Sequence, residues 1–222
     1  MFVLGQLEMA LMLTVDCVLS HLNVECLYLQ KRDHPAYGKH HGISEREWWL
    51  DFVYRVFTAA GYRGSADSLL PMSDALIVHL DANSPALETL PHAVDCLERF
   101  KSSGLILGIV SNSDESLIAT LKQHKLYSFF DFLQYSAATG LQKPDPKVYQ
   151  QALQAAGNVD PADAAHIGDE LISDYFAPRK IGMMSFLLDP ANRYTNDDLK
   201  DVDKNCVVKD LSELHQLIHV KT

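Results

Sequence analysis

The sequence has few cysteines, and none of them form a close pair. Cys17, Cys26, Cys96 and Cys206 are widely separated in 222 residues, without a Cys-x-x-Cys spacing. This pattern gives no indication of a structural zinc site or of the disulfide framework of a small secreted domain. Reduced thiols in an intracellular protein fit it better, and a chain of this length buries a sufficient core without cross-links.

The sequence is also short of positive charge. Nineteen Lys and Arg residues stand against 29 Asp and Glu residues, which gives a formal net charge of −10. Such a balance argues against non-specific binding to nucleic acid or to an anionic membrane. An acidic chain that binds a phosphorylated ligand needs a local cation, which is either a lysine or a bound metal.

A long uninterrupted apolar run is missing as well. The N-terminal residues 1–22 are mostly apolar, but Glu8 interrupts them and Asp16 follows. The uninterrupted part is too short to span a bilayer. No basic residue precedes it and no clear small-residue cleavage site closes it, so we expect no export signal and a cytoplasmic location.

Alternating strand and helix patterns are present from about residue 85 onward. The segments LILGIVSN, DFLQY, AAHIGD and MMSFLLD are typical of strands, and helical patterns separate them. This rhythm predicts a parallel sheet with helices on both faces. Residues 22–80 instead show helical patterns with hardly a strand, and the apolar face around Trp48 and Trp49 is most simply the buried side of a helix.

Two carboxylates follow one of the predicted strands, in the stretch HIGDELISD. Asp169 ends the strand pattern and Asp174 comes five residues later. Ligands of parallel α/β sheets bind at the carboxyl ends of the strands, which favours a functional interpretation. The alternative is that Asp169 caps a helix and Asp174 is a solvated helical residue.

Three short motifs fall at predicted strand ends or helix starts: IVSNSD at 109–114, LQKPDP at 141–146, and HIGDELISD at 166–174. In this order and spacing they resemble the haloacid dehalogenase-like hydrolases, a superfamily of mostly Mg²⁺-dependent phosphatases. The resemblance implies that Ser111 and its neighbour Asn112 bind the transferring phosphoryl group, and that Lys143 neutralises phosphate and nucleophile. It also implies that Asp169 and Asp174 hold Mg²⁺. Stabilisation of phosphoryl oxygens by a metal, a lysine and oriented donors agrees with this chemistry.

A narrower resemblance lies in HPAYGKHHGISEREWWLDFVYRVFTAAG, which is similar to the cap of the haloacid dehalogenase-like hydrolase domain-containing protein three subgroup. The expected organisation is therefore an α/β protein with a Rossmann-like core at 85–222. A helical cap is expected at 22–84, after an atypical N-terminal segment at 1–21 that is a remnant or a replacement of the first core strand.

The first motif of the family, Asp-x-Asp-x-Thr, supplies the nucleophile, and here it is degenerate. Its only candidate is LMLTVDCVLS, with Asp16 as nucleophile, Val18 at the second carboxylate and Ser20 at the threonine. Valine cannot transfer a proton, and HPAYG begins only 18 residues after Asp16. Either Asp16 belongs to a shortened first motif, or residues 1 to about 22 replace it and the nucleophile is lost.

We favour loss of the nucleophile. The expected function is then a family homologue of reduced or absent activity, a pseudoenzyme that keeps the pocket for Mg²⁺ and a small phosphorylated metabolite. The alternative is an active phosphatase that uses Asp16. A dehalogenase is disfavoured, because Gly-Asp-x4-Asp is typical of the metal-dependent phosphatases. The sequence sets neither the substrate nor the oligomeric state, although an exposed edge at an altered first strand would favour association.

Overall fold

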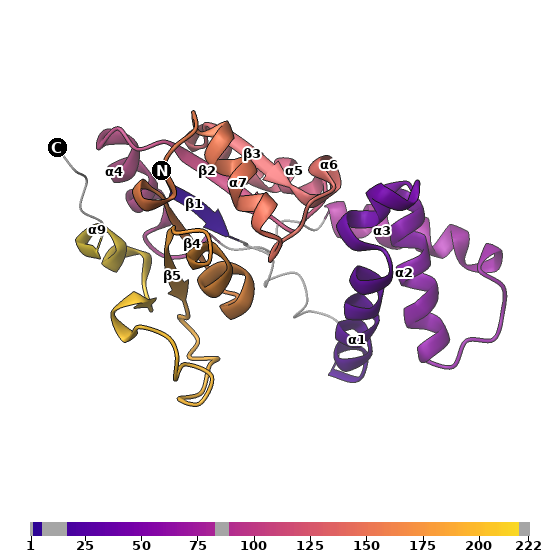
Figure 1. Ribbon diagram of the computed structural model, residues 1–222. Helices are drawn as coiled ribbons and strands as arrows, with labels where there is room; N and C mark the ends of the chain where they lie inside the picture. The colour runs from indigo at the N-terminus through magenta and orange to yellow at the C-terminus, as the bar shows by residue number, and fades with distance from the viewer. Residues whose placement is uncertain (1, 6–16, 83–88, 218–222) are drawn as a thin grey trace.

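The computed structural model describes residues 2–5, 17–82 and 89–217. Within these ranges no helix is long and apolar enough to cross a membrane. The described chain forms a parallel sheet with helices on both faces, and a helical unit stands beside one end of the sheet (Figure 1).

The sheet has six strands in the order β3-β2-β1-β4-β5-β6, and every neighbouring pair is parallel. This confirms the predicted α/β class. The strands are β1 (Phe2–Gly5), β2 (Leu107–Ser111), β3 (Phe132–Tyr135), β4 (Ala165–Gly168), β5 (Met184–Leu188) and β6 (Val207–Val208).

The helices divide between the helical unit and the layers over the sheet. They are α1 (Cys17–Asp33), α2 (Glu45–Ala59), α3 (Leu70–Ala82), α4 (Ala93–Ser102), α5 (Ser116–Gln123), α6 (Ser136–Thr139), α7 (Pro146–Ala155), α8 (Ala177–Arg179) and α9 (Leu214–Leu217). Short 3₁₀ turns lie at Pro35–His41, Asp67–Leu69, Tyr127–Phe129, Pro161–Asp163, Lys204–Cys206 and Leu211–Glu213, and Leu171–Phe176 is a π-helical turn.

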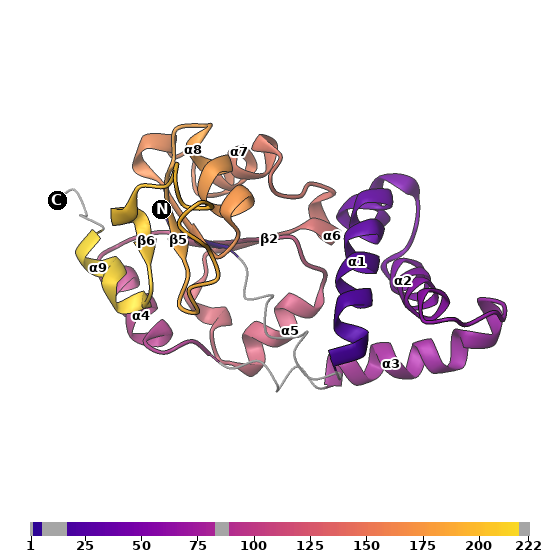
Figure 2. The same ribbon diagram turned by 90° about the horizontal axis from the view of Figure 1, so that it is seen from below.

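Alternation along the strands divides the core between the two faces of the sheet. Successive side chains of a strand point to opposite faces, so Ile109 and Ile167 pack in the cluster that includes residues of α4 and α5. Val110 packs in the opposite cluster, with residues of α7 and α8. Figure 2 shows α7 and α8 on one side of the sheet and α4 and α5 on the other.

The helical unit, which we call the cap, consists of α1, α2 and α3 and the turns between them. Helix α2 starts at a capping box, in which the Ser44 hydroxyl accepts from the Glu47 backbone N–H and the Glu47 carboxylate accepts from Ser44. Such a reciprocal pair satisfies backbone donors that a helix start leaves free. Trp48 of this helix is core, as expected, because it is 1% exposed and its ring centroid lies 4.6 Å from that of Tyr37. Trp49 is only partly buried.

One element differs from the sequence pattern. The helical pattern between LILGIVSN and DFLQY is not a single helix, because α5 ends at Gln123, Lys125 adopts a left-handed φ of 59°, and a separate turn follows. This reversal brings Leu126 into the same core cluster as Leu121. Within the N-terminal segment, for which a remnant of the first core strand was one of the two expected alternatives, β1 pairs with both β2 and β4 in the middle of the sheet.

Candidate functional site

The phosphate motif lies where β2 ends. Ser111 is the last residue of β2 and is buried. Ser111 ends β2 and Asp169 follows β4, and these are the two strands that flank β1. Two inter-strand spacings separate such positions, or about 10 Å. The predicted phosphate and metal residues therefore share the carboxyl edge of one sheet.

Asn112 holds the backbone of Lys143 at two points. Its Oδ1 accepts from the Lys143 N–H at 2.7 Å, and its Nδ2 donates to the Lys143 carbonyl at 2.8 Å. The helix α7 then starts at Pro146, with Asp145 as its N-cap. The side chain of Asn112 is thus engaged in joining the second motif to the third, and its predicted role in substrate binding stays a prediction.

The Lys143 side chain belongs to a buried network of charged and polar groups. The Lys143 Nζ donates to Asp174 Oδ1 at 2.7 Å, and both side chains are fully buried. The His166 Nε2 reaches the same oxygen at 2.8 Å, and the Glu170 backbone N–H donates to Asp174 Oδ2 at 3.0 Å. A buried carboxylate requires such donors, because an unpaired charge away from water is costly.

The protonation states of this network follow from its contacts. Burial alone would raise the pKa of Asp174, but the Lys143 ammonium and the His166 hydrogen bond outweigh burial and hold this pKa well below its usual range. Burial lowers the pKa of His166 despite the neighbouring carboxylate, so the ring is neutral. Its proton then lies on Nε2, facing Asp174, which leaves Nδ1 as a buried atom without a partner among the described residues.

The Asp174 carboxylate also explains why residue 168 is a glycine. A Cβ at this position would lie 2.4 Å from the Asp174 Cγ and 2.8 Å from its Cβ. Contacts that short do not occur between real atoms, so any side chain at residue 168 would displace Asp174. The glycine of the Gly-Asp motif therefore provides room for the second aspartate.

Asp169 is held differently from Asp174. Its Oδ2 accepts from the Arg193 Nη2 at 2.8 Å, and its main-chain carbonyl accepts from the same Nη2 and from the Tyr194 hydroxyl, both at 2.7 Å. Oδ1 is buried and has no hydrogen-bond partner among the described residues. Burial raises the pKa of Asp169, although Arg193 opposes the rise.

The donor set fits a divalent cation at Asp169. A free carboxylate oxygen is a ligand that Mg²⁺ prefers, and Mg²⁺ commonly takes one or two carboxylates, substrate phosphate and several waters. Asp174 offers less, because Lys143, His166 and the Glu170 N–H already occupy its oxygens. Across residues 2–5, 17–82 and 89–217, no three or more His, Cys, Asp or Glu side chains cluster as a metal site.

The predicted nucleophile Asp16 lies outside the described residues, immediately before α1. The described strand at the centre of the sheet is β1, which ends at Gly5, opposite Val110 and one residue before the position of Ser111 in β2. Gln6 and Leu7 follow Gly5 in the sequence, and the next aspartate in the chain is Asp16.

The cap contacts the same edge of the core. The Tyr37 hydroxyl donates to the Asn112 carbonyl at 3.4 Å, and the Ala36 N–H donates to Gln142 Oε1 at 3.0 Å. The His40 Nε2 lies 2.7 Å from the Gly140 carbonyl oxygen. The cap therefore rests on the residues that precede Lys143 and on the second motif.

A second contact places the cap helix α2 against the start of α5. The Trp49 Nε1 donates to Asp114 Oδ2 at 2.9 Å. Glu45 lies in the same interface, where burial and the nearby carboxylates of Asp114 and Glu115 raise the pKa of Glu45 to about 7. This part of the contact between cap and core carries an excess of negative charge.

Sequence reasoning missed His166, Arg193 and Tyr194. His166 lies two residues before Gly168 in β4, so its side chain points to the face of the sheet opposite to that of Ile167, and this alternation was a usable signal. Its ring packs edge-on against Tyr149 of α7, with centroids 5.5 Å apart. Arg193 lies 24 residues after Asp169 in a loop. No periodic pattern marks it.

The family model for haloacid dehalogenase-like hydrolases matches residues 21–182 of this chain. The chain belongs to the haloacid dehalogenase-like hydrolase family. Membership confirms the resemblance predicted from the three motifs, and the relatives described next confirm the narrower resemblance of the cap segment.

The curated relatives include haloacid dehalogenase-like hydrolase domain-containing protein 3 of Homo sapiens, 39% identical over 160 residues, which cover 72% of this chain and 62% of that protein. The Mus musculus protein of the same name is 36% identical over 186 residues, covering 83% of this chain and 72% of that protein. The chain thus spans less than two thirds of the human relative's length.

Solved structures of the haloacid dehalogenase-like hydrolase fold match nearly the whole chain. A dehalogenase has a TM-score of 0.72 at 23% identity, with 99% of this chain and 97% of that chain covered. The magnesium-bound putative hydrolase YfnB of Bacillus subtilis has a TM-score of 0.71 at 14% identity, with 99% and 98% covered. At these identities the likeness shows the fold alone.

Proposed function

We propose that this protein binds a small phosphorylated metabolite together with Mg²⁺ at the carboxyl edge of its sheet, with little or no hydrolysis. In this proposal the phosphate binds beside Ser111, Lys143 supplies positive charge from its buried position against Asp174, and the free oxygen of Asp169 is the direct protein ligand of the metal. Bound Mg²⁺ supplies positive charge for the phosphate oxygens. Asp174, predicted from the sequence as a second metal ligand, contributes by holding Lys143.

The observation that carries the proposal of weak turnover is the sequence at the end of the central strand. Covalent phosphoryl transfer in this family needs a carboxylate nucleophile, because an amide or an alkyl side chain does not attack phosphorus. Gln6 and Leu7 follow Gly5, which pairs with Val110 beside Ser111. Asp16 is 11 residues beyond Gly5, and the position corresponding to a second carboxylate is Val18.

Binding and turnover can be measured separately on the whole chain. Inorganic phosphate with Mg²⁺ is expected to raise the melting temperature, because a ligand that binds only the folded state stabilises it by RT ln(1 + [L]/Kd). At about 100 times Kd this equals about 2.7 kcal/mol, or about 5 to 10 °C for a chain of this size. Phosphate release from a panel of small phosphomonoesters is expected to stay at background.

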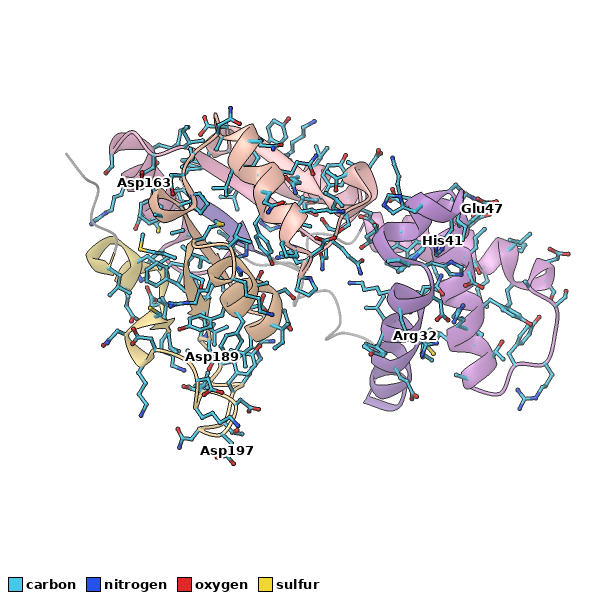
Figure 3. The ribbon with its side chains drawn as sticks, viewed as in Figure 1. Arg32, His41, Glu47, Asp163, Asp189 and Asp197 are labelled. Carbon is cyan, nitrogen blue, oxygen red and sulfur yellow. The ribbon has the colours of Figure 1, made fainter. Side chains whose placement is uncertain are left out.

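The matched variants are Asp169→Asn and Asp197→Asn, since Asp197 is an exposed aspartate at the far tip of the loop after β5 (Figure 3). The Mg²⁺-dependent shift should vanish in Asp169→Asn and persist in Asp197→Asn. Robust Mg²⁺-dependent phosphate release that disappears in Asp16→Asn would overturn the proposal of weak turnover and identify an active phosphatase. Absence of any shift in the wild type would remove the binding site itself.

A further inference from the structure

The loop that follows β5 crosses over to the Gly-Asp motif. The Arg193 Nη2 donates both to Asp169 Oδ2 at 2.8 Å and to the Asp169 carbonyl at 2.7 Å. The Tyr194 hydroxyl donates to the same carbonyl at 2.7 Å and accepts from the Leu171 N–H at 3.1 Å. Arg193 and Tyr194, which are adjacent in the chain, therefore hold both the side chain and the backbone of Asp169.

The buried carboxylate of Asp189 holds this loop to the core. Asp189 is fully buried directly after β5, and its Oδ1 accepts from the Arg193 backbone N–H at 2.7 Å. Its Oδ2 pairs with the Lys209 Nζ at 3.1 Å. Figure 3 shows Asp189 where the loop leaves the core and Asp197 at the far end of the loop. The position of Arg193 is thus set by the fold and not only by a surface ion pair.

The two carboxylate oxygens of Asp169 have different hydrogen-bonding environments. Arg193 occupies Oδ2, whereas Oδ1 is buried and has no partner among the described residues. A buried acceptor without a partner is unfavourable unless a ligand completes it. If the Arg193 guanidinium took the place of a bound cation, it would contact Oδ1, the oxygen that is free for a cation. Arg193 instead contacts Oδ2 and so fixes the rotamer of the carboxylate.

We propose that Arg193 is a positioning residue, which holds Asp169 through Oδ2 so that Oδ1 is directed to a divalent cation. This inference rests on the proposed metal site at Asp169. Hydrogen bonds to a ligating carboxylate from outside the coordination sphere orient it, and their loss typically lowers metal affinity by about 10- to 100-fold. The positive charge of Arg193 has the opposite effect on metal affinity, because it repels a cation. Removal of the side chain should therefore weaken metal binding if positioning dominates and strengthen it if charge repulsion dominates.

The test measures Mn²⁺ affinity from the free-ion electron paramagnetic resonance signal, since Mn²⁺ shares the oxygen preference of Mg²⁺. The variants are Arg193→Met and Lys180→Met, which lose the same charge; Lys180 is exposed on the turn after α8. Arg193→Met is expected to raise the Kd for Mn²⁺ by about 10-fold or more. Lys180→Met should stay within about twofold of the wild type, since exposed charges are well screened.

Far-UV circular dichroism of the metal-free proteins checks that each variant is folded. If Arg193→Met does not fold, the polar pair Arg193→Gln and Lys180→Gln gives the same comparison. Unchanged or tighter Mn²⁺ binding in the Arg193 variant would overturn the positioning role, the tighter result indicating a competing charge instead. A wild type that binds no Mn²⁺ would sink the proposed metal site as well, which separates that failure from a failure of the role of Arg193 alone.

Discussion

The buried pair of Lys143 and Asp174 gives a quantitative prediction. In Asp174→Asn the side chain keeps its shape but loses its charge, so the Lys143 ammonium, which is fully buried, loses the carboxylate that it contacts at 2.7 Å. Neutral His166 cannot replace that charge. Removal of one member of a buried pair costs about 3 to 5 kcal/mol, which corresponds to a fall of about 6 to 20 °C in melting temperature for a chain of this length.

The assay is urea unfolding followed by far-UV circular dichroism, with Asp197→Asn as the exposed control. The control should change the free energy of unfolding by less than about 0.5 kcal/mol. Lys143→Met should also be costly, because it leaves a buried carboxylate with only neutral donors. The double variant should cost less than the sum of the two, by about 0.5 to 3 kcal/mol.

Two results would refute this reasoning. A loss below about 1 kcal/mol in Asp174→Asn would place the pair in the range of exposed ion pairs. Additive losses in the double variant would show that the two charges do not stabilise one another. Either outcome would mean that Lys143 is not held by Asp174 in solution.

Two further predictions concern Gly168 and Glu45. Gly168→Ala would push against the Asp174 carboxylate, which a Cβ would approach within 2.4 Å, and should cost about 1 to 3 kcal/mol in chemical denaturation; a neutral result would show that Asp174 moves freely. The folded pKa of Glu45 is raised to about 7 by burial and by Asp114 and Glu115, so its charge destabilises the fold increasingly as pH rises from about 4 through this value. Glu45→Gln should therefore stabilise the protein by up to about 1 kcal/mol at pH 8, after solvent screening, and by nothing near pH 4. A gain that is the same in melting curves at both pH values would contradict this assignment.

The sequence by itself determined the class of fold and predicted the edge of the sheet at which the candidate site lies. The short apolar runs in LILGIVSN and AAHIGD, together with the intervening helical patterns, are sufficient to predict parallel strands, and parallel strands bring their carboxyl ends to the same edge of the sheet. Asp169 and Asp174 are close in sequence, and a local motif of this kind is readable without a structure.

Only the tertiary structure decided which partner each polar group has. Asp174 pairs with Lys143, and Asp169 pairs with Arg193, although both carboxylates belong to one motif. These choices depend on the order of strands in the sheet and on where the loop after β5 returns, which bring together residues more than 20 positions apart in the chain. The central place of β1 was decided in the same way. The sequence left residues 1–21 as either a remnant or a replacement of the first core strand, whereas pairing with β2 and β4 on both sides satisfies the backbone hydrogen bonds of β1.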